Sequence, residues 1–415
     1  MLGYRLKPWF DPQDARKLLN LTETLCELIA IPSVNPMGRG LCGPEYLESR
    51  LTEYLERVFR SLGLPTLRQA VAAQRENILV RLDSDRGSAS EGRLLLWEVH
   101  QDTVPVDNMT IAPFLPQVDG NRVYGRGSCD VKGGMAAMLL ALHRLAETRP
   151  PGMPTLVLAC TVNEEHGFSG AAELTRLWEE DSITDFLGRR PDACVVAEPT
   201  NLQTVVSHKG AVRWKCHTWG QSAHSSHPQQ GSNAIYQMGK IIHSLEEYAQ
   251  NIVPSLANHP LCGCPTLSVG TILGGTSVNT VPEQCTIEID RRLVPGESLR
   301  EAYNHVVARL ESLEGVNVSH DQPWLNSPGL SNTNNSELAQ AVGDAAKRQG
   351  IDCHSLGVAY GTNAATIAQS GIPTVVFGPG SIDQAHTADE WIDLREVEAA
   401  SDVLYNLAAT ERSCW

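Results

Sequence analysis

His100 and Asp102 are the first residues along the chain whose types and spacing could do metal chemistry. Their side chains leave an extended backbone on the same side, because they are two residues apart. A neutral imidazole binds a cation best when a carboxylate holds its other ring nitrogen, and Asp102 could fill that role. A core histidine with a nearby capping aspartate explains the same pair equally well.

Asp130 and the adjacent pair Glu164 and Glu165 could supply further carboxylates. Asp130 stands among four glycines, which let the backbone approach closely, and its two oxygens could bridge two cations. Taken alone, Asp130 is better explained as a helix N-cap. Of the adjacent pair, one residue could bind a cation while the other transfers a proton. Burying two neighbouring acids without cations is costly, which favours a functional role for this pair.

Glu198, His386 and His224 complete the set of reactive side chains. Glu198 and His386 each follow an apolar run, and each alone could be a capping glutamate or a loop histidine. Five metal-capable positions at predicted strand ends, with complementary ligand types, are harder to explain in this way. His224 stands among small polar residues and could donate to a developing oxyanion, although its own context is equally that of a loop histidine.

Two patterns of elements would position these residues. Apolar runs alternate with helical patterns up to about residue 200 and again after about residue 336, which predicts an α/β domain with a mostly parallel sheet covered by helices. Ligand sites collect at the carboxyl ends of parallel strands. The predicted strands cover 77–82, 93–100, 155–162, 193–197 and 373–377, and predicted helices cover 12–30, 44–62 and 133–145.

The pattern of hydrophobic and polar residues is different between residues 210 and 322. Alternating patterns at 212–218, 266–273 and 284–291 predict half-buried strands, and amphipathic patterns at 233–249 and 298–313 predict two helices. Two helices on a small antiparallel sheet form an α+β module. We therefore expect a catalytic domain made of 1–209 and 323–415, interrupted by a smaller domain at 210–322.

The composition is that of a globular protein. Of the 415 residues, 42% are hydrophobic and 20% are charged, and the formal net charge is −15. This acidic balance disfavours nucleic acids and anionic membranes as partners, because both need a basic surface. The 11 cysteines are scattered, and no apolar signal segment stands at the N-terminus. We expect a soluble cytoplasmic protein.

These motifs, in this order, resemble the two-zinc amidohydrolase family of acetylornithine deacetylase, succinyl-diaminopimelate desuccinylase, aminoacylase and carboxypeptidase G. The resemblance covers nearly the whole chain and implies two zinc ions per subunit, for which cobalt or manganese could substitute. It also implies that Glu164 is the general base and that Asp102 orients a ligand histidine. The implied ligands are His100, Glu198 and bridging Asp130 for one ion, and Asp130, Glu165 and His386 for the other.

Residues 210–322 are similar to the family's ferredoxin-like lid and dimerisation domain, which implies a homodimer. His224 matches the lid histidine that, in dimeric members, reaches the partner subunit's active site. Asn279 and Arg292 fall where the family places contacts to the substrate carboxylate. The implied substrate is a small N-acyl amino acid or a dipeptide.

Within the family, 207–210 and 378–386 are most similar to acetylornithine deacetylases, which implies hydrolysis of N-acetyl-L-ornithine in arginine biosynthesis. Asn363 departs from that pattern, because an acidic residue that could pair with the substrate's side-chain amine is expected there. A succinyl-diaminopimelate desuccinylase, a metal dipeptidase or a carboxypeptidase would share the metal site. A catalytically silent binding relative would be expected to lose a ligand or the base, and this chain keeps them all.

Overall fold

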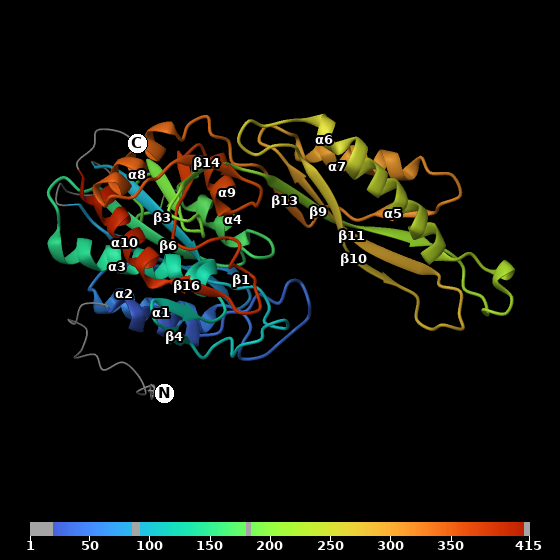
Figure 1. The fold of residues 1–415 in the computed structure, drawn as a ribbon, viewed down its shortest axis with the longest axis horizontal. Helices are drawn as coiled ribbons and strands as arrows, with labels where there is room; N and C mark the ends of the chain where they lie inside the picture. The colour runs from blue at the N-terminus through green and yellow to red at the C-terminus, as the bar shows by residue number, and fades with distance from the viewer. Residues whose placement is uncertain (1–19, 85–91, 180–183, 411–415) are drawn as a thin grey trace. The chain divides into compact units, whose positions relative to one another are not determined.

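The computed structural model describes residues 20–84, 92–179 and 184–410, and the chain forms two compact units (Figure 1). Unit 1 comprises the residues up to Thr204, Glu337–His354 and the residues from Ile372 onward. Unit 2 comprises Val205–Ser336 and Ser355–Gly371. Unit 2 therefore includes more of the chain than the insertion expected at 210–322.

Unit 1 contains the mostly parallel sheet flanked by helices that the sequence predicts. Its strands follow one another across the sheet as β1 (Thr66–Ala72), β2 (Arg75–Leu82), β6 (Thr155–Thr161), β3 (Leu94–His100), β7 (Ala193–Val196) and β15 (Thr374–Val376). The pairs β6–β3, β3–β7 and β7–β15 are parallel, whereas β1–β2 and β2–β6 are antiparallel. Every residue of β3 and β6 is buried, which explains why both strands are mostly apolar, although β3 also contains the buried Glu98.

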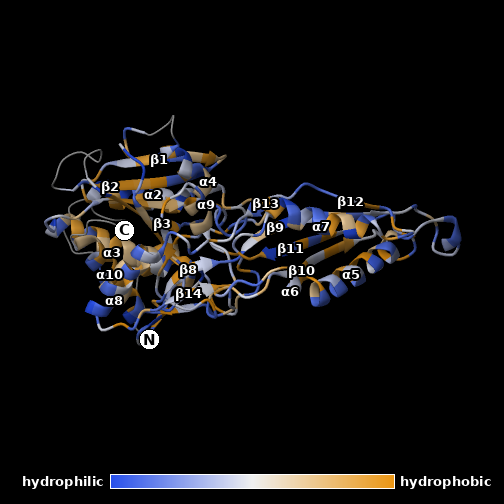
Figure 2. Ribbon diagram, turned by 90° about the horizontal axis from the view of Figure 1, so that it is seen from above, coloured by the Kyte–Doolittle hydropathy of each residue, from blue (hydrophilic) through white to orange (hydrophobic). Residues whose placement is uncertain are grey.

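The helices of this unit pack on and around the sheet. They are α1 (Leu21–Ala30), α2 (Ser49–Ser61), α3 (Gly133–Thr148), α4 (Ser169–Thr175), α8 (Ser336–Arg348) and α10 (Leu394–Ala409). Helix α3 contacts β3, α1 and α10, and both α2 and α4 contact β1 and β2. A small second sheet joins β4 (Gln117–Asp119), β5 (Arg122–Tyr124) and β16 (Trp391–Asp393). Figure 2 shows hydrophobic residues gathered in the strands and in the helix faces beside them.

Two of the predicted helices differ from the observed ones. The part of the first that precedes residue 20 lies outside the described residues. The second was expected to begin at Pro44, but α2 begins at Ser49. Leu47 has a φ of 64°, in the left-handed region, so the helix cannot extend back through it.

Unit 2 is the predicted α+β module, with further short elements. Its strands are β8 (Thr204–His208), β9 (Gly210–Trp219), β10 (Thr266–Gly274), β11 (Gln284–Leu293), β12 (Val318–His320), β13 (Leu325–Ser327) and β14 (Ser355–Val358). Its helices are α5 (Ala234–Asn251), α6 (Val253–Leu256), α7 (Leu299–Glu311) and α9 (Asn363–Gln369). No helix within the described ranges is long and apolar enough to cross a bilayer.

Helices α5 and α7 lie on one antiparallel sheet of order β10-β11-β9-β12. Residues of β9 and β11 alternate between buried and partly exposed, as predicted, because one face meets the core around Trp214 and Ile287. The helices begin where the sequence supplies caps. The side chains of Asn233 and Ser298 accept the backbone N–H groups of Tyr236 and Glu301.

Candidate metal centre

The structure brings the five predicted ligands together within unit 1. His100 is the last residue of β3, Glu165 follows β6, and Glu198 follows β7. Because these strands are parallel neighbours, their carboxyl ends lie at one edge of the sheet. Asp130 precedes α3, and His386 lies between β15 and β16.

Asp130 joins the two halves of this cluster. Its Oδ1 lies 3.1 Å from Nε2 of His100, and its Oδ2 lies 3.2 Å from Nε2 of His386. Oε2 of Glu165 is 3.4 Å from the same nitrogen of His386, and Oε2 of Glu198 is 4.0 Å from Nε2 of His100. Each oxygen of Asp130 thus faces a different imidazole, an arrangement in which one carboxylate could bridge two cations.

His100, Asp130 and Glu198 are buried, Glu165 is partly buried and His386 is exposed, and the cluster has more acidic than basic groups. Burial raises the pKa values of Glu164, Glu165 and Glu198, and neighbouring carboxylates, Asp130 among them, raise them further. Oε1 of Glu165 is buried and has no hydrogen-bond partner in the part of the chain that the structure describes. Cations would supply both the missing positive charge and a partner for this oxygen, so the residues present fit a metal centre.

Two sets of three residues have ligand atoms that all lie within 4.8 Å of one another. One set is His100, Glu164 and Glu198, and the other is His100, Asp130 and Glu165. Imidazole and carboxylate ligands suit zinc, and cobalt or manganese can also occupy such sites. Both sets include His100, and the first includes the expected base Glu164. The division of the ligands between two ions therefore stays a prediction.

Asp102 contacts His100 differently from what the sequence predicts. Nδ1 of His100 lies 2.9 Å from the backbone oxygen of Asp102 but 3.8 Å from its carboxylate. A carbonyl oxygen only accepts, so Nδ1 carries the proton and Nε2 is left to bind a cation. The carboxylate instead accepts the backbone N–H groups of Glu164 at 3.0 Å and Glu165 at 3.1 Å. Asp102 thus holds the loop that carries both glutamates.

Asn35 was not among the predicted site residues, yet it holds Asp102 in place. Its Nδ2 donates to Oδ2 of Asp102 at 2.8 Å and to Oδ1 of Asn163 at 3.0 Å, and its side chain is fully buried. Asn35 neither titrates nor suits a metal, and its partners lie far along the chain. No local pattern in the sequence therefore pointed to it.

Asn163 was missed for the same reason, and it turns the chain towards the two glutamates. Its φ is 63°, in the left-handed region that asparagine tolerates better than most residues. Arg75 Nη1 donates to its Oδ1 at 2.8 Å, and the buried Glu48 binds Arg75 at 2.5 Å and the backbone N–H of Asn163 at 3.2 Å. This partly buried network fixes the turn that positions Glu164.

The other predicted residues belong to unit 2. His224 and Asn279 are both exposed. Their loops are adjacent, because the N–H of Ser225 donates to the backbone oxygen of Asn279 at 3.0 Å and His224 forms a β-bridge with Thr280. Nδ1 of His224 accepts the N–H of Ser226 at 3.2 Å, so the neutral ring carries its proton on Nε2. The structure thus brings His224 and Asn279 together.

Arg292 and Asn363 lie in other surroundings of unit 2. The guanidinium of Arg292 contacts both carboxylate oxygens of Asp290, at 2.8 and 3.1 Å. Asn363 is buried at the start of α9, directly after the N-cap Thr362. Oγ1 of Thr362 is 3.1 Å from Nε2 of His208, whose pKa burial lowers to about 4. The substrate contacts expected of Arg292 and Asn363 stay predictions.

Comparisons with known proteins agree with this fold. Residues 96–410 match peptidase family M20/M25/M40. The acetylornithine deacetylase of Erwinia tasmaniensis is 33% identical over 399 residues, which cover 94% of this chain and 97% of that protein.

Solved structures share the fold. A tripeptidase from Staphylococcus aureus has a TM-score of 0.73 at 21% identity, covering 94% of this chain and 98% of that one. A dinuclear metal-binding M20 peptidase from Bacillus subtilis has a TM-score of 0.65 at 18% identity, covering 96% and 98%. Together with the sequence match over most of its length, this shows that the chain is a metal-dependent hydrolase belonging to peptidase family M20/M25/M40.

Proposed function

We propose that this hydrolase cleaves the amide bond of N-acyl amino acids with two zinc ions per subunit, and that N-acetyl-L-ornithine is its substrate. The observation that carries the proposal is the placement of the two Asp130 oxygens against His100 and His386. The similarity to an acetylornithine deacetylase over nearly the whole chain supports the choice of substrate. The products would be L-ornithine and acetate, which suits a role in arginine biosynthesis.

The proposed chemistry divides between the metal ions and Glu164. Bound zinc ions would polarise the amide carbonyl and lower the pKa of the attacking water. Glu164 would take a proton from that water and pass it to the leaving nitrogen. Burial raises the pKa of Glu164, which makes it a better base near neutral pH. Asp102 would hold Glu164 in place through its backbone N–H.

His224 would stabilise the oxyanion that forms at the attacked carbonyl carbon. Its Nε2 carries the proton in the neutral ring, and the exposed side chain is free of the buried contacts that hold the metal ligands. In a homodimer this imidazole would act in the active site of the partner subunit. Asn279 and Arg292 would bind the substrate carboxylate, and Asn363 would face its side chain.

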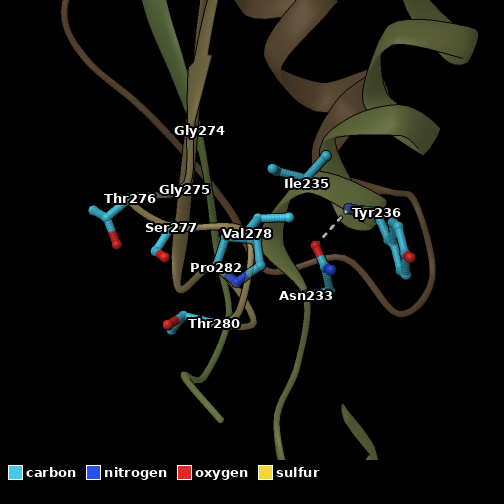
Figure 3. Close-up of a pocket in the computed structure, with 10 residues that line it drawn as sticks. All are labelled: Asn233, Ile235, Tyr236, Gly274, Gly275, Thr276, Ser277, Val278, Thr280 and Pro282. Carbon is cyan, nitrogen blue, oxygen red and sulfur yellow. Dashed lines mark hydrogen bonds between the residues drawn. The ribbon is translucent and has the colours of Figure 1, made fainter. Parts of the chain in front are cut away.

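The homodimer would form through unit 2. Strand β10 is an edge of its sheet, and Ile272 and Leu273 on it are 53% and 77% exposed. Figure 3 shows a pocket between the start of α5 and the loop after β10. Two of the residues that line it, Val278 and Tyr236, are 100% and 76% exposed. An unpaired edge with exposed apolar side chains favours pairing with a second copy.

Asn363 favours a different substrate for the same amide hydrolysis. A neutral, buried amide at this position has no charge to pair with a substrate amine. An acyl amino acid without a side-chain amine, or a dipeptide, would then be the better substrate. The metal centre and the role of Glu164 would be unchanged.

Release of free amine from a small panel of substrates tests the proposal. The panel contains N-acetyl-ornithine, N-acetyl-methionine, N-succinyl-diaminopimelate and a dipeptide, each with zinc or cobalt and again with a chelator. We expect chelator-sensitive turnover that is fastest on N-acetyl-ornithine. Faster turnover of another compound would contradict the ornithine assignment alone. No turnover on any compound by metal-loaded protein would overturn the proposed activity.

A further inference from the structure

Glu390 is a fully buried carboxylate that lies four residues after His386 and directly before β16. Its Oε2 accepts hydrogen bonds from Nη1 of Arg126 at 2.7 Å and from the N–H of Gly127 at 2.9 Å. Its Oε1 accepts the N–H groups of Cys129 at 2.8 Å and of Asp130 at 3.0 Å. All four hydrogen bonds hold the loop that ends at the shared metal ligand Asp130.

The four donors require a carboxylate at position 390. Each oxygen of Glu390 accepts two hydrogen bonds, so an amide would place its NH₂ group against two donors whichever way it turned. The loop can wrap around Glu390 because Gly127 has a φ of 79°, and a Cβ there would come within 2.7 Å of Thr103. The glycines near Asp130 in the sequence thus include one that lets the backbone enclose this side chain.

The segment of Glu390 also connects the two loops that carry Asp130 and His386. The backbone oxygen of Glu390 accepts the N–H of Gly125 at 3.0 Å, and Trp391 of β16 pairs with Tyr124 of β5. One short stretch of chain therefore sets both the Asp130 loop and the end of the His386 loop. This connection places Nε2 of His386 3.2 Å from Oδ2 of Asp130.

We propose that Glu390 is a positioning residue for the metal centre, which holds Asp130 so that its two oxygens face His100 and His386 and thereby sets the affinity for both cations. Glu390 itself contacts no cation in this arrangement, because both of its oxygens are occupied by the four donors. The inference rests on the proposed two-metal function.

A residue that only supports the fold can be told apart from one that positions Asp130. A purely structural residue would lower the melting temperature equally with and without bound cations. A positioning residue would also reduce the increase in melting temperature that cations produce, because that increase depends on their affinity for the folded state. It would in addition change the visible spectrum of bound cobalt, which reports the geometry of the ligands.

The experiment compares full-length wild type, Glu390→Gln and Glu390→Asp with Glu297→Gln as the matched control. Glu297 lies in unit 2, where it accepts a hydrogen bond from the buried Arg291 at 2.8 Å and one from the N–H of Val294 at 2.7 Å. It therefore has the same kinds of partner but touches no metal ligand. Each protein is stripped with chelator, then titrated with Zn²⁺ and Co²⁺ while binding, cobalt absorption and melting temperature are measured.

We expect Glu390→Gln to bind cations at least about 10-fold more weakly than wild type, with an altered cobalt spectrum. Glu390→Asp, which keeps the charge on a shorter side chain, should recover part of the affinity. Glu297→Gln should keep the wild-type affinity and spectrum, even if its melting temperature falls.

Two results would overturn the inference while the proposed function stands. One is a folded Glu390→Gln protein with two cations bound at wild-type affinity and with the wild-type spectrum. The other is loss of folding in both Glu390 variants, which would assign the residue a purely structural role. Wild-type protein that binds fewer than two cations would instead overturn the two-metal function itself.

Discussion

The metal cluster of unit 1 and the loop of His224 in unit 2 use similar side chains in opposite surroundings. His100 and Asp130 are 2% and 7% exposed, and the backbone N–H of Asp130 donates to Glu390, which lies 260 residues further along the chain. His224 is exposed, and among the described residues its side chain forms hydrogen bonds only with Ser226, two residues along the chain. Side chains held by buried hydrogen bonds keep one geometry, whereas an exposed side chain on a loop is less constrained. Substitutions in the two regions should therefore have different effects on catalysis, cation binding and stability.

The largest effect is expected from Glu164→Gln. The amide cannot take a proton, so kcat on the best substrate should fall by about 10²–10⁴-fold, with two cations still bound. Steady-state kinetics together with metal analysis of the purified protein test this. A metal-loaded Gln variant with near wild-type turnover would exclude Glu164 as the base.

A smaller loss is expected from His224→Ala, at about 100-fold in kcat. Cation affinity should not change, because the imidazole lies in unit 2 and is not a ligand. If it acts across a dimer, mixing His224→Ala with Glu164→Ala protein should restore activity in re-associated heterodimers. Mixed dimers that stay inactive would rule out action in trans.

The buried His208 should make unit 2 less stable in acid. Its folded pKa of about 4 lies below the usual value of 6.5, so the unfolded chain binds more protons between these values and stability falls as the pH falls. Between pH 7 and pH 5 this group should remove about 2 kcal/mol from the free energy of unfolding. Urea unfolding at both pH values, with His208→Gln as the comparison, measures it. An equally steep pH dependence in that variant would contradict the assignment.

Two paired asparagine substitutions should have effects of similar size on stability but different effects on cation binding. Asn35→Ala removes a donor from buried Asp102 and should cost about 1–3 kcal/mol of stability, with weaker cation binding. Asn335→Ala removes a buried asparagine of unit 2, whose Nδ2 donates to the backbone oxygens of Val206 and Ser331, and should cost stability alone. Cation titration and thermal melting separate the two outcomes. Equal cation affinity in both variants would show that Asn35 does not support the metal centre.

The sequence predicted the elements whose signals are local. The buried strands β3 and β6 are mostly apolar, and the starts of α5 and α7 have their own capping residues. The start of α2 was placed too early, because the left-handed backbone of Leu47 has no signal in its residue type. Glu390 and Asn35 were missed, because their partners lie up to 264 and 128 residues away.

The amino-acid sequence by itself determined which side chains are candidate ligands and that parallel strands would bring several of them to one edge of a sheet. Only the tertiary structure decided that the two oxygens of Asp130 face different histidines, that Asp102 turns its carboxylate to the backbone of Glu164 and Glu165, and that Glu390 encloses the Asp130 loop. The physical reason is that hydrogen bonds depend on tenths of an ångström between atoms that the fold brings together from distant positions. Residue types and spacing pointed to Asp102 and Asp130 but not to Glu390, and they could not place the atoms of any of the three.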